Sequence, residues 1–250
     1  MGIYKTNGII LKRKDFGEAD KLVTIFTDSE GKINVKAKGI RWLLSKNKGH
    51  LELFNYSDLM IAEGKEIDTV ASAFTLESFK RIKEDLKKTA VAFYLAELCD
   101  KLIPFKEKNK KIFDLLLESL RHLDRDEKPK ILTRYFELNL LATLGFKPEV
   151  NLCVHCRKQL LPIFNFFSSK LGGVCCPSCC QKFDPKSLKI SKKALSTLRL
   201  LLSYNLETVL RFKIDKETER EVEGISENFL KYVAEKKFKS PRFLQEIENE

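Results

Sequence analysis

The sequence predicts an α+β protein of several domains, in which a β module is followed by a helical bundle that a cysteine-rich segment interrupts. Three observations predict this order. Short β-rich runs fill residues 1–76, apolar residues recur at helical spacing from residue 77, and six of the seven cysteines lie within residues 150–183. We therefore expect a β domain at 1–76 and a helical domain at 77–250 that contains the cysteine segment.

Five runs rich in β-branched and aromatic residues predict the strands of the β module. Gly, Asp or Asn separates most of them, and they read NGIILKR, DKLVTIFT, GKINVKAKG, LFNYSDLMIAEG and IDTVASAF. Five short strands at this spacing favour a small barrel or sandwich.

Apolar periodicity predicts the helices, in VAFYLAELCDKL, KKIFDLLLESLRHL, ILTRYFELNLLATLG, SKKALSTLRLLLSYN and ETEREVEGISENFLKYVAEK. Pro104 ends the first, and the third begins near Pro129 and ends at Gly145. Because the third helix is apolar on most sides, we expect it at the centre of the bundle. Ser191 is a suitable cap for the fourth.

Two Cys-x-x-Cys pairs predict a metal site. Cys153 and Cys156 form the first pair, and Cys176 and Cys179 form the second. Each pair can make a tight turn whose two thiolates point the same way, and four thiolates complete the tetrahedron that zinc prefers. Because this set leaves no open coordination position, we expect one structural zinc ion.

The residues around these pairs leave alternatives open. Cys175 with Cys179 is another possible pairing, although only the spacing given above makes two equal pairs. Cys175 and Cys180 are then small buried residues or alternate ligands. His155 is more simply a bystander than a ligand, and Cys99 lies among apolar helical residues, where we expect it in the core.

The composition narrows the partners and the compartment. A net charge of +11 favours a polyanionic partner, either nucleic acid or a membrane surface. There is no apolar run long enough to span a bilayer and no signal-peptide core at the N-terminus, so we expect a cytoplasmic protein without a membrane partner. Thiols stay reduced in that compartment, which favours metal or redox chemistry over a disulfide framework. The βαβ pattern that a redox pair needs is absent.

A basic segment at residues 31–51, GKINVKAKGIRWLLSKNKGHL, contains no acid. In a strand, Ile33, Val35 and Ala37 would face the core while the lysines form a cationic ladder opposite. The following loop adds cations around Trp42, the only tryptophan. Cations and an exposed ring suit single-stranded nucleic acid, and five strands presenting such a face fit an OB-fold. The candidate nucleic-acid-binding residues are Lys32, Lys36, Lys38, Arg41, Trp42, Lys46 and Lys48.

The alternative interpretation of residues 31–51 is a solvated strand face with Trp42 in the core. Other basic stretches are weaker signals, although KKFKSPR near the C-terminus could extend the basic track. No phosphate-binding loop, nucleophile elbow or zincin helix is present. His50-Leu-Glu52 matches a deaminase fragment, but the proline that should precede Cys-x-x-Cys lies inside it. We therefore expect binding without catalysis.

Three runs together resemble the RecO family of bacterial DNA repair proteins. FGEADKLVTIFTDSEGKINVKAKGIRWLLSKNKGHLELF is similar to the family's N-terminal module, and RYFELNLLATLGFKPEVNLCVHC to its buried helix and first zinc pair. FFSSKLGGVCCPSC is similar to the Gly-Gly-x-x-Cys-x-x-Cys that completes the site, which selects Cys176 and Cys179. The resemblance covers nearly the whole chain, including KFKSPRFL.

The resemblance implies an OB-fold domain, an α-helical domain and a zinc-ribbon insertion. It also implies a nucleoid-associated mediator that binds single- and double-stranded DNA, anneals complementary strands without ATP and helps to load RecA. The implied partners are RecR and the acidic C-terminal tail of single-stranded DNA-binding protein. By matching motif, Lys38 is the lysine of Ala-Lys-Gly, and Arg134 is carried over as a contact for that tail.

Two further functions remain as alternatives on the residues alone. The first is a zinc-ribbon adaptor that binds RNA or acts in transcription. The second is a zinc hydrolase, which the saturated set of four thiolates disfavours because it leaves no position for a water.

Overall fold

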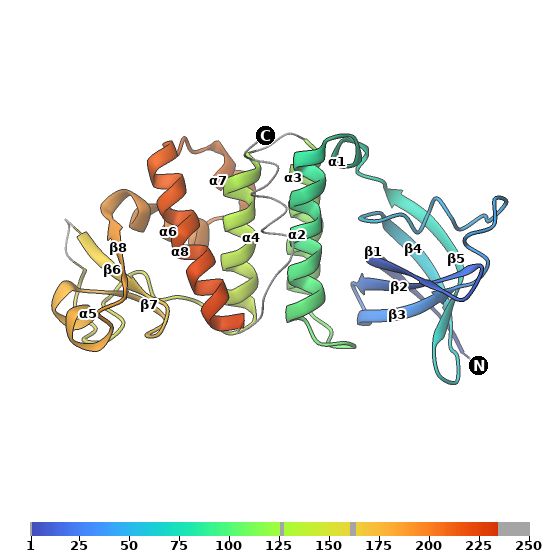
Figure 1. Cartoon of the computed structure of the whole chain (residues 1–250), viewed down its shortest axis with the longest axis horizontal. Helices are drawn as coiled ribbons and strands as arrows, with labels where there is room; N and C mark the ends of the chain where they lie inside the picture. The colour runs from blue at the N-terminus through green and yellow to red at the C-terminus, as the bar shows by residue number, and fades with distance from the viewer. Residues whose placement is uncertain (1, 126–127, 161–163, 235–250) are drawn as a thin grey trace. The chain divides into compact units, whose positions relative to one another are not determined.

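The computed structural model describes residues 2–125, 128–160 and 164–234 of the 250-residue chain (Figure 1). These residues form two compact units that divide at residues 126 and 127. Strands fill the chain up to Glu77, close to the expected boundary at 76, but the next three helices pack in the same unit as the strands. The tail runs KKFKSPR and KFKSPRFL lie outside the described residues.

The first unit contains a closed five-stranded barrel in the order β1-β2-β3-β5-β4. Antiparallel β1 pairs with both β2 and β4, and β3 closes the barrel by pairing in parallel with β5. This is the OB-like barrel that the sequence predicts, and every predicted run supplies one strand. The strands are β1 (Ile3–Phe16), β2 (Asp20–Thr27), β3 (Gly31–Ala37), β4 (Tyr56–Ala62) and β5 (Asp68–Glu77).

The alternation predicted for β3 is confirmed at most positions. Ile33, Val35 and Ala37 are buried in the barrel core, together with apolar residues from the other strands. Lys36 is half-buried and Lys38, just beyond the strand, is exposed on the outer side. The strand therefore supplies core packing from one face and cations from the other.

Lys32 departs from this pattern, because its side chain is only 2% exposed. Its ammonium donates to the backbone carbonyl oxygen of Asp100, lies 3.6 Å from the Asp100 carboxylate and stands 4.4 Å from the centroid of the Phe105 ring. The prediction that Lys32 joins the nucleic-acid-binding face is therefore wrong. Because it is buried, the Lys32 ammonium is not accessible to a ligand, and its contacts with Asp100 and Phe105 stabilise the fold.

The helices of the first unit are α1 (Lys80–Glu84), α2 (Leu86–Leu102) and α3 (Lys110–Asp124). Asp85 and Asn109 cap the second and third by accepting backbone N–H groups with their side chains. Cys99 is fully buried on α2, and this burial raises the pKa of its thiol. The expectation of a core cysteine is confirmed.

The start of β3 also contacts the connection between α2 and α3 through the backbone. Lys106 N–H donates to the carbonyl oxygen of Lys32 at 2.9 Å, and Lys32 forms a β-bridge with Phe105. Gly31 has a φ of +69°, and a Cβ there would collide with the Glu107 backbone. Only glycine permits this approach, so residues 31 and 32 join the barrel to the helices.

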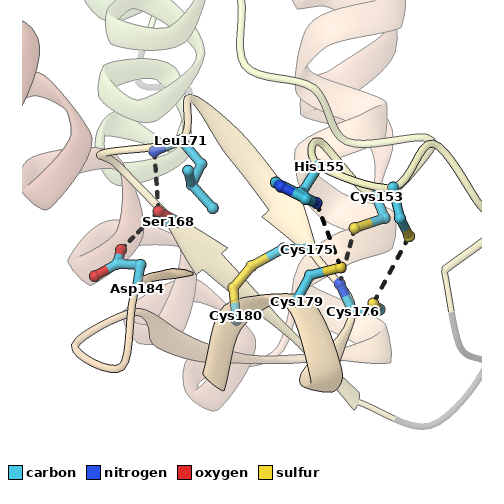
Figure 2. The surroundings of a disulfide bond; sticks show 10 residues. Cys153, His155, Ser168, Leu171, Cys175, Cys176, Cys179, Cys180 and Asp184 are labelled. Atoms are coloured by element: carbon cyan, nitrogen blue, oxygen red, sulfur yellow. Dashed lines mark hydrogen bonds between the residues drawn. A yellow bond between two sulfur atoms is a disulfide. The ribbon is translucent and has the colours of Figure 1, made fainter. Parts of the chain in front are cut away.

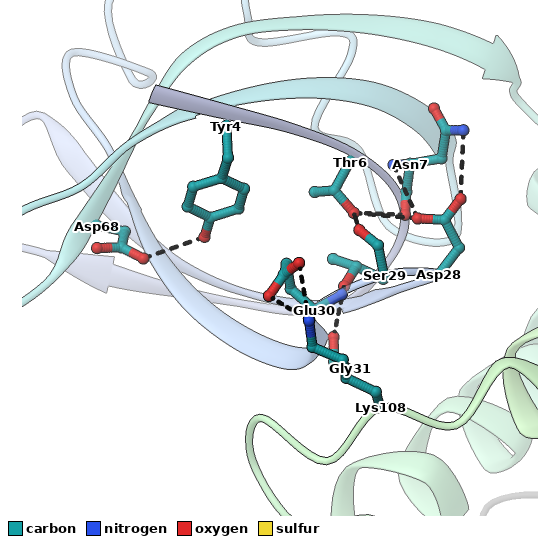
Figure 3. A network of polar contacts seen from close by, with 10 residues as sticks. Tyr4, Thr6, Asn7, Asp28, Ser29, Glu30, Gly31, Asp68 and Lys108 are labelled. Carbon is teal, nitrogen blue, oxygen red and sulfur yellow. Dashed lines mark hydrogen bonds and ion pairs between the residues drawn. The ribbon is translucent and has the colours of Figure 1, made fainter. Parts of the chain in front are cut away.

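A polar network fixes the turn between β2 and β3 (Figure 3). The Asp28 carboxylate accepts the Thr6 hydroxyl at 3.1 Å and the Asn7 backbone N–H at 3.3 Å. On the other side, Lys108 forms an ion pair with Glu30 at 3.2 Å. The turn is thus held between β1 and the connection that follows α2.

In the second unit, α4 contacts α6, α7 and α8. Nearly all of α4 from residue 131 to 141 is buried, which confirms the prediction of a central helix. Ser191 caps α6 by accepting the Ala194 N–H at 3.1 Å, also as predicted. These helices are α4 (Pro129–Thr143), α6 (Lys192–Ser203), α7 (Leu206–Arg211) and α8 (Lys216–Ala234).

The cysteine segment contains a three-stranded sheet in the order β7-β6-β8 and one short helix. The sequence did not predict these elements, because strands of three to five residues are too short to show an alternating pattern. They are β6 (Phe164–Ser168), β7 (Gly173–Cys175), α5 (Pro177–Phe183) and β8 (Leu188–Ser191). In the part of the chain that the structure describes, no helix has both the length and the apolarity needed to cross a bilayer.

Replacing Lys32 by Met should lower the free energy of unfolding of the first unit by about 1.5–3 kcal/mol, the usual value of a hydrogen bond from a charged donor. Lys38→Met removes an exposed cation and should change that free energy by less than about 0.5 kcal/mol. Urea unfolding followed by hydrogen exchange of the barrel amides measures both. Equal effects of the two substitutions would contradict the role assigned to Lys32.

Candidate nucleic-acid interface and metal centre

The basic segment places six of the seven predicted nucleic-acid-binding residues on β3 and the loop that follows it. We call this the basic loop surface, and it consists of Lys36, Lys38, Arg41, Trp42, Lys46 and Lys48. All of these side chains are exposed except Lys36, which is half-buried. Six of the seven predicted nucleic-acid-binding residues are therefore at least partly exposed, and Trp42 is on the surface rather than in the core.

Both ends of the loop are anchored in the barrel. Ile40 and Leu51 are buried in its core. Arg41 N–H donates to the carbonyl oxygen of Ala19 at 3.0 Å, and Gly39 N–H donates to the Asp20 carboxylate at 2.7 Å. The exposed side chains are thus carried by a loop with a defined path.

Two acids, one near the end of β1 and one at the start of β2, lie beside these cations. Lys36 forms an ion pair with Asp20 at 2.9 Å, and Arg41 lies 3.8 Å from Asp15. The Gly39 N–H and then Lys36 lower the pKa of Asp20, so this carboxyl stays ionised. The run 31–51 contains no acid, so its own residues could not show this. Pairing of β1 with β2 and of β2 with β3 brings the acids close.

The remaining lysines of the surface are differently placed. Among the described residues, no carboxylate comes within ion-pair distance of Lys38, Lys46 or Lys48. Their charge is available to an anion, whereas a phosphate that approaches Lys36 or Arg41 must compete with a carboxylate. The electrostatic attraction of this surface therefore rests mainly on the three loop lysines.

The four predicted thiols converge in the second unit (Figure 2). The sulfur atoms of Cys153, Cys156, Cys176 and Cys179 all lie within 4.8 Å of one another, and those of Cys156 and Cys176 are 4.0 Å apart. Four sulfurs at about 2.3 Å from a tetrahedral zinc are about 3.8 Å from each other. The cluster is close to the size that one tetrahedral ion requires.

Backbone hydrogen bonds shape the first turn and join it to the second. Cys153 N–H donates to Lys158 O at 2.8 Å, and Arg157 N–H donates back to Cys153 O at 2.9 Å. Val154 N–H donates to Val174 O at 2.8 Å. The segment of the first pair thus lies against β7, which leads directly into the second pair.

The glycine pair before the second Cys-x-x-Cys allows this close approach. Glu149 pairs with Gly173, and a Cβ on Gly173 would collide with the Glu149 backbone. Ser168 accepts the Leu171 N–H at 3.0 Å and donates to the Asp184 carboxylate at 2.6 Å, which fixes the preceding turn. The Gly-Gly is therefore a requirement of the backbone path rather than a ligand feature.

The thiols of the cluster differ in their affinity for a proton. Burial raises the pKa of Cys153, but hydrogen bonds from backbone N–H groups outweigh this effect and lower the pKa to about 6. One of these groups is the N–H of Cys176, whose nitrogen lies 3.4 Å from the sulfur. The hydrogen bond with Cys176, with burial and the nearby Cys153 charge, raises the pKa of Cys179 to about 12. Cys153 therefore favours the thiolate and Cys179 the neutral thiol, and a cation that binds all four sulfurs would displace the Cys179 proton.

Cys175 and Cys180 lie outside this set. They are paired with each other as a disulfide, with their Cα atoms 5.7 Å apart, and both are buried. Burial of these two was expected, but their pairing was not predicted. His155 stacks on Phe183 with ring centroids 3.9 Å apart and is not one of the four clustered ligands, as expected for a bystander.

Arg134 is buried on α4 and surrounded by acids. Its guanidinium lies 3.1 Å from Glu137, 3.4 Å from Glu223 and 3.7 Å from Glu227. An acidic peptide that approached this position would meet three carboxylates around one cation. The geometry therefore speaks against the expected contact between Arg134 and an acidic tail.

Comparison with known proteins shows which family both units match. The family model for the N-terminal part of recombination protein O matches residues 1–79, and the model for its C-terminal part matches residues 83–242. A DNA repair protein RecO from Dehalococcoides mccartyi is 37% identical over 244 residues, which cover 98% of this chain and 96% of the relative.

Two other relatives carry the same name. The protein from a Roseiflexus species is 37% identical over 245 residues, covering 98% of this chain and 86% of the relative. The protein from Halalkalibacterium halodurans is 30% identical over 246 residues, covering 98% and 96%. With matches of this extent over both units, the chain belongs to the RecO family of DNA repair proteins.

Proposed function

We propose that this protein is a non-catalytic recombination mediator of the nucleoid. It binds single- and double-stranded DNA through the basic loop surface, anneals complementary strands without ATP and assists RecA loading on strands coated with single-stranded DNA-binding protein. The observation that supports this proposal most directly is the exposed basic loop surface on an OB-like barrel, in a chain of a DNA repair family.

Annealing needs no chemical step from the protein, because base pairing supplies the free energy. Two strands repel each other through their phosphates, and cations that neutralise some of these phosphates reduce the repulsion and raise the local strand concentration. Three to five cations of the basic loop surface give an expected slope of log affinity against log salt of about −2 to −3.5 for single strands.

We further propose that the acidic tail of single-stranded DNA-binding protein binds the second unit at a cleft of about 520 Å³. Arg199, Tyr204, Phe212 and Lys213 are among its lining residues, and the two rings are about half exposed. Cations beside exposed rings are complementary to a peptide with both acidic and apolar side chains. RecR is proposed as a partner on family grounds alone.

The ion that fits the four thiols best is zinc, and we propose one zinc ion per chain. Zinc favours tetrahedral thiolate sets, and a set of four protein ligands is typical of a structural site. The ion would bind the two turns of the cysteine segment to each other and favour the thiolate form of its four ligands. The family's repair function then needs no reaction at this metal.

Substituting Lys38, Lys46 and Lys48 together by Ala should weaken single-strand binding for every sequence and flatten the salt slope by about 2, because three phosphate contacts are lost. A charge-matched control substitutes the exposed Lys65, Lys80 and Lys87 by Ala. Fluorescence anisotropy over a salt series measures both variants. The same slope in the wild type and the loop variant would rule out this surface.

The proposed activity predicts that the protein accelerates duplex formation between two complementary oligonucleotides coated with single-stranded DNA-binding protein, without ATP. The acceleration should disappear when the coating protein lacks its acidic tail. Lys213→Glu should reduce it on coated strands while leaving annealing of bare strands unchanged. No acceleration together with a preference for RNA over DNA would instead support a nucleic-acid-binding adaptor.

For the metal, we expect about one equivalent of zinc per chain, lost in a Cys176→Ser variant and after chelation. Loss of zinc should increase hydrogen exchange in residues 149–160 and 173–183, because the free energy of metal binding contributes to the folding of these segments. The control is Cys175→Ser with Cys180→Ser, which should keep the zinc. A metal-free protein with unchanged exchange in these segments would contradict a structural role.

A further inference from the structure

The tip of the loop after β3 exposes three consecutive apolar side chains. Trp42 is 69% exposed, Leu43 is 88% exposed and Leu44 is 92% exposed. Single exposed apolar residues are ordinary on a protein surface, but a contiguous group at the end of a projecting loop marks a place that contacts something else.

The backbone of the loop holds this tip away from the barrel core. Trp42 N–H donates to Gly39 O at 3.1 Å, Ser45 N–H to Trp42 O at 3.2 Å, and Lys48 N–H to Ser45 O at 3.2 Å. These successive turns, between the buried anchors on either side, give the tip a defined shape. The exposure of these apolar side chains therefore results from a defined loop conformation and not from poor packing.

The backbone of Gly39 packs against the indole of Trp42 and helps to position it. Gly39 has a φ of +59°, and a Cβ there would lie 2.9 Å from the Trp42 ring. The ring thus lies against the backbone of Gly39 while most of its surface stays open. Trp42 and Leu44 line a cleft of about 400 Å³ together with Lys38, Asp20, Gly39 and Ser45. The indole and the leucine give this cleft an apolar wall beside a lysine, which suits a base whose phosphate lies next to it, and the Asp20 carboxylate is paired with Lys36.

The charges around the tip decide the chemistry of its occupant. Lys38 and Arg41 precede it and Lys46 and Lys48 follow it along the chain, and all four side chains are exposed. A single strand of nucleic acid has the complementary pattern, with phosphates on the outside and apolar base faces. In an intact duplex base pairing holds those faces stacked, whereas unpaired bases separate at lower cost, and apolar wedges in other proteins enter between base steps.

We propose that Trp42, Leu43 and Leu44 form an apolar wedge that inserts between unpaired bases and unstacks them, while the neighbouring lysines hold the phosphates. This inference rests on the proposed function, since it assigns a role within the same surface. It adds that the surface distinguishes single strands from duplex by contact with base faces. Unstacked bases are then held open for pairing with a second strand.

The test uses Leu43→Ser with Leu44→Ser, which removes the apolar tip but keeps every cation and the only tryptophan as a fluorescent reporter. Because both leucines are almost fully exposed, this variant should fold normally. The matched control is Ile3→Ser with Leu86→Ser, which removes two exposed apolar side chains elsewhere on the first unit. Three ligands of equal length are compared: a thymine single strand, an abasic single strand and a duplex.

In the wild type, we expect the thymine strand to quench Trp42 fluorescence and the abasic strand to quench it little. The tip variant should bind the thymine strand about 10-fold more weakly, because the two leucine side chains no longer cover the faces of bases. Its affinity for the abasic strand and its salt slope should not change. A single strand with 2-aminopurine should become more fluorescent with wild type than with the tip variant, because the wedge unstacks it.

Equal affinities of the tip variant and the wild type for the thymine strand would overturn the wedge. So would an equal loss on all three ligands, because base contact predicts a loss on the thymine strand alone. Binding of the wild type, but not the tip variant, to anionic lipid vesicles with unchanged binding to DNA would assign the tip to a membrane surface instead. Failure of the proposed function is distinguishable, since it appears in the variant that lacks Lys38, Lys46 and Lys48.

Discussion

The buried ammonium of Lys32 is the interaction on which the arrangement of the first unit depends. The carbonyl of Asp100 is four residues before Pro104, which has no N–H to donate, so the last turn of α2 ends with an unsatisfied acceptor. Lys32 reaches across from β3 and satisfies it. Because the end of a helix carries partial negative charge, a cation suits this position. The barrel and its helices are thereby fastened at the point where β3 begins.

The contact between Lys32 and Asp100 determines which positions of β3 remain exposed on its outer face. Because Lys32 is covered by the end of α2 and Gly31 lies against the connection after it, the exposed outer positions of β3 begin at Asn34. Asp15 on β1 and Asp20 on β2 pair with Arg41 and Lys36, whereas the three loop lysines have no such partner among the described residues. The sequence shows only that this surface is basic. In the structure, its cations differ in how available they are, and the loop lysines attract an anion most strongly.

The metal centre follows a similar logic in the second unit. Its ligands come from two segments about 20 residues apart, and the close approach of Gly173 to Glu149 brings these segments together. N–H groups directed at Cys153 favour its thiolate, while the Cys179 thiol holds its proton. A cation bound by all four sulfurs would favour the thiolate form of each. The proposed zinc ion would therefore stabilise a geometry that the backbone already approximates.

Neighbours along the chain are enough to predict the five strands, the central helix α4, the four clustered thiols and the basic run after β3. These are properties of periodicity and spacing. Which charges are available depends instead on tertiary contacts, since Lys32 and Arg134 are buried and paired with residues 60 or more positions away. Local pattern shows which face a side chain takes, but burial and ion pairing depend on what packs against that face. The same limit applies to Trp42, whose exposure depends on the anchoring of its loop.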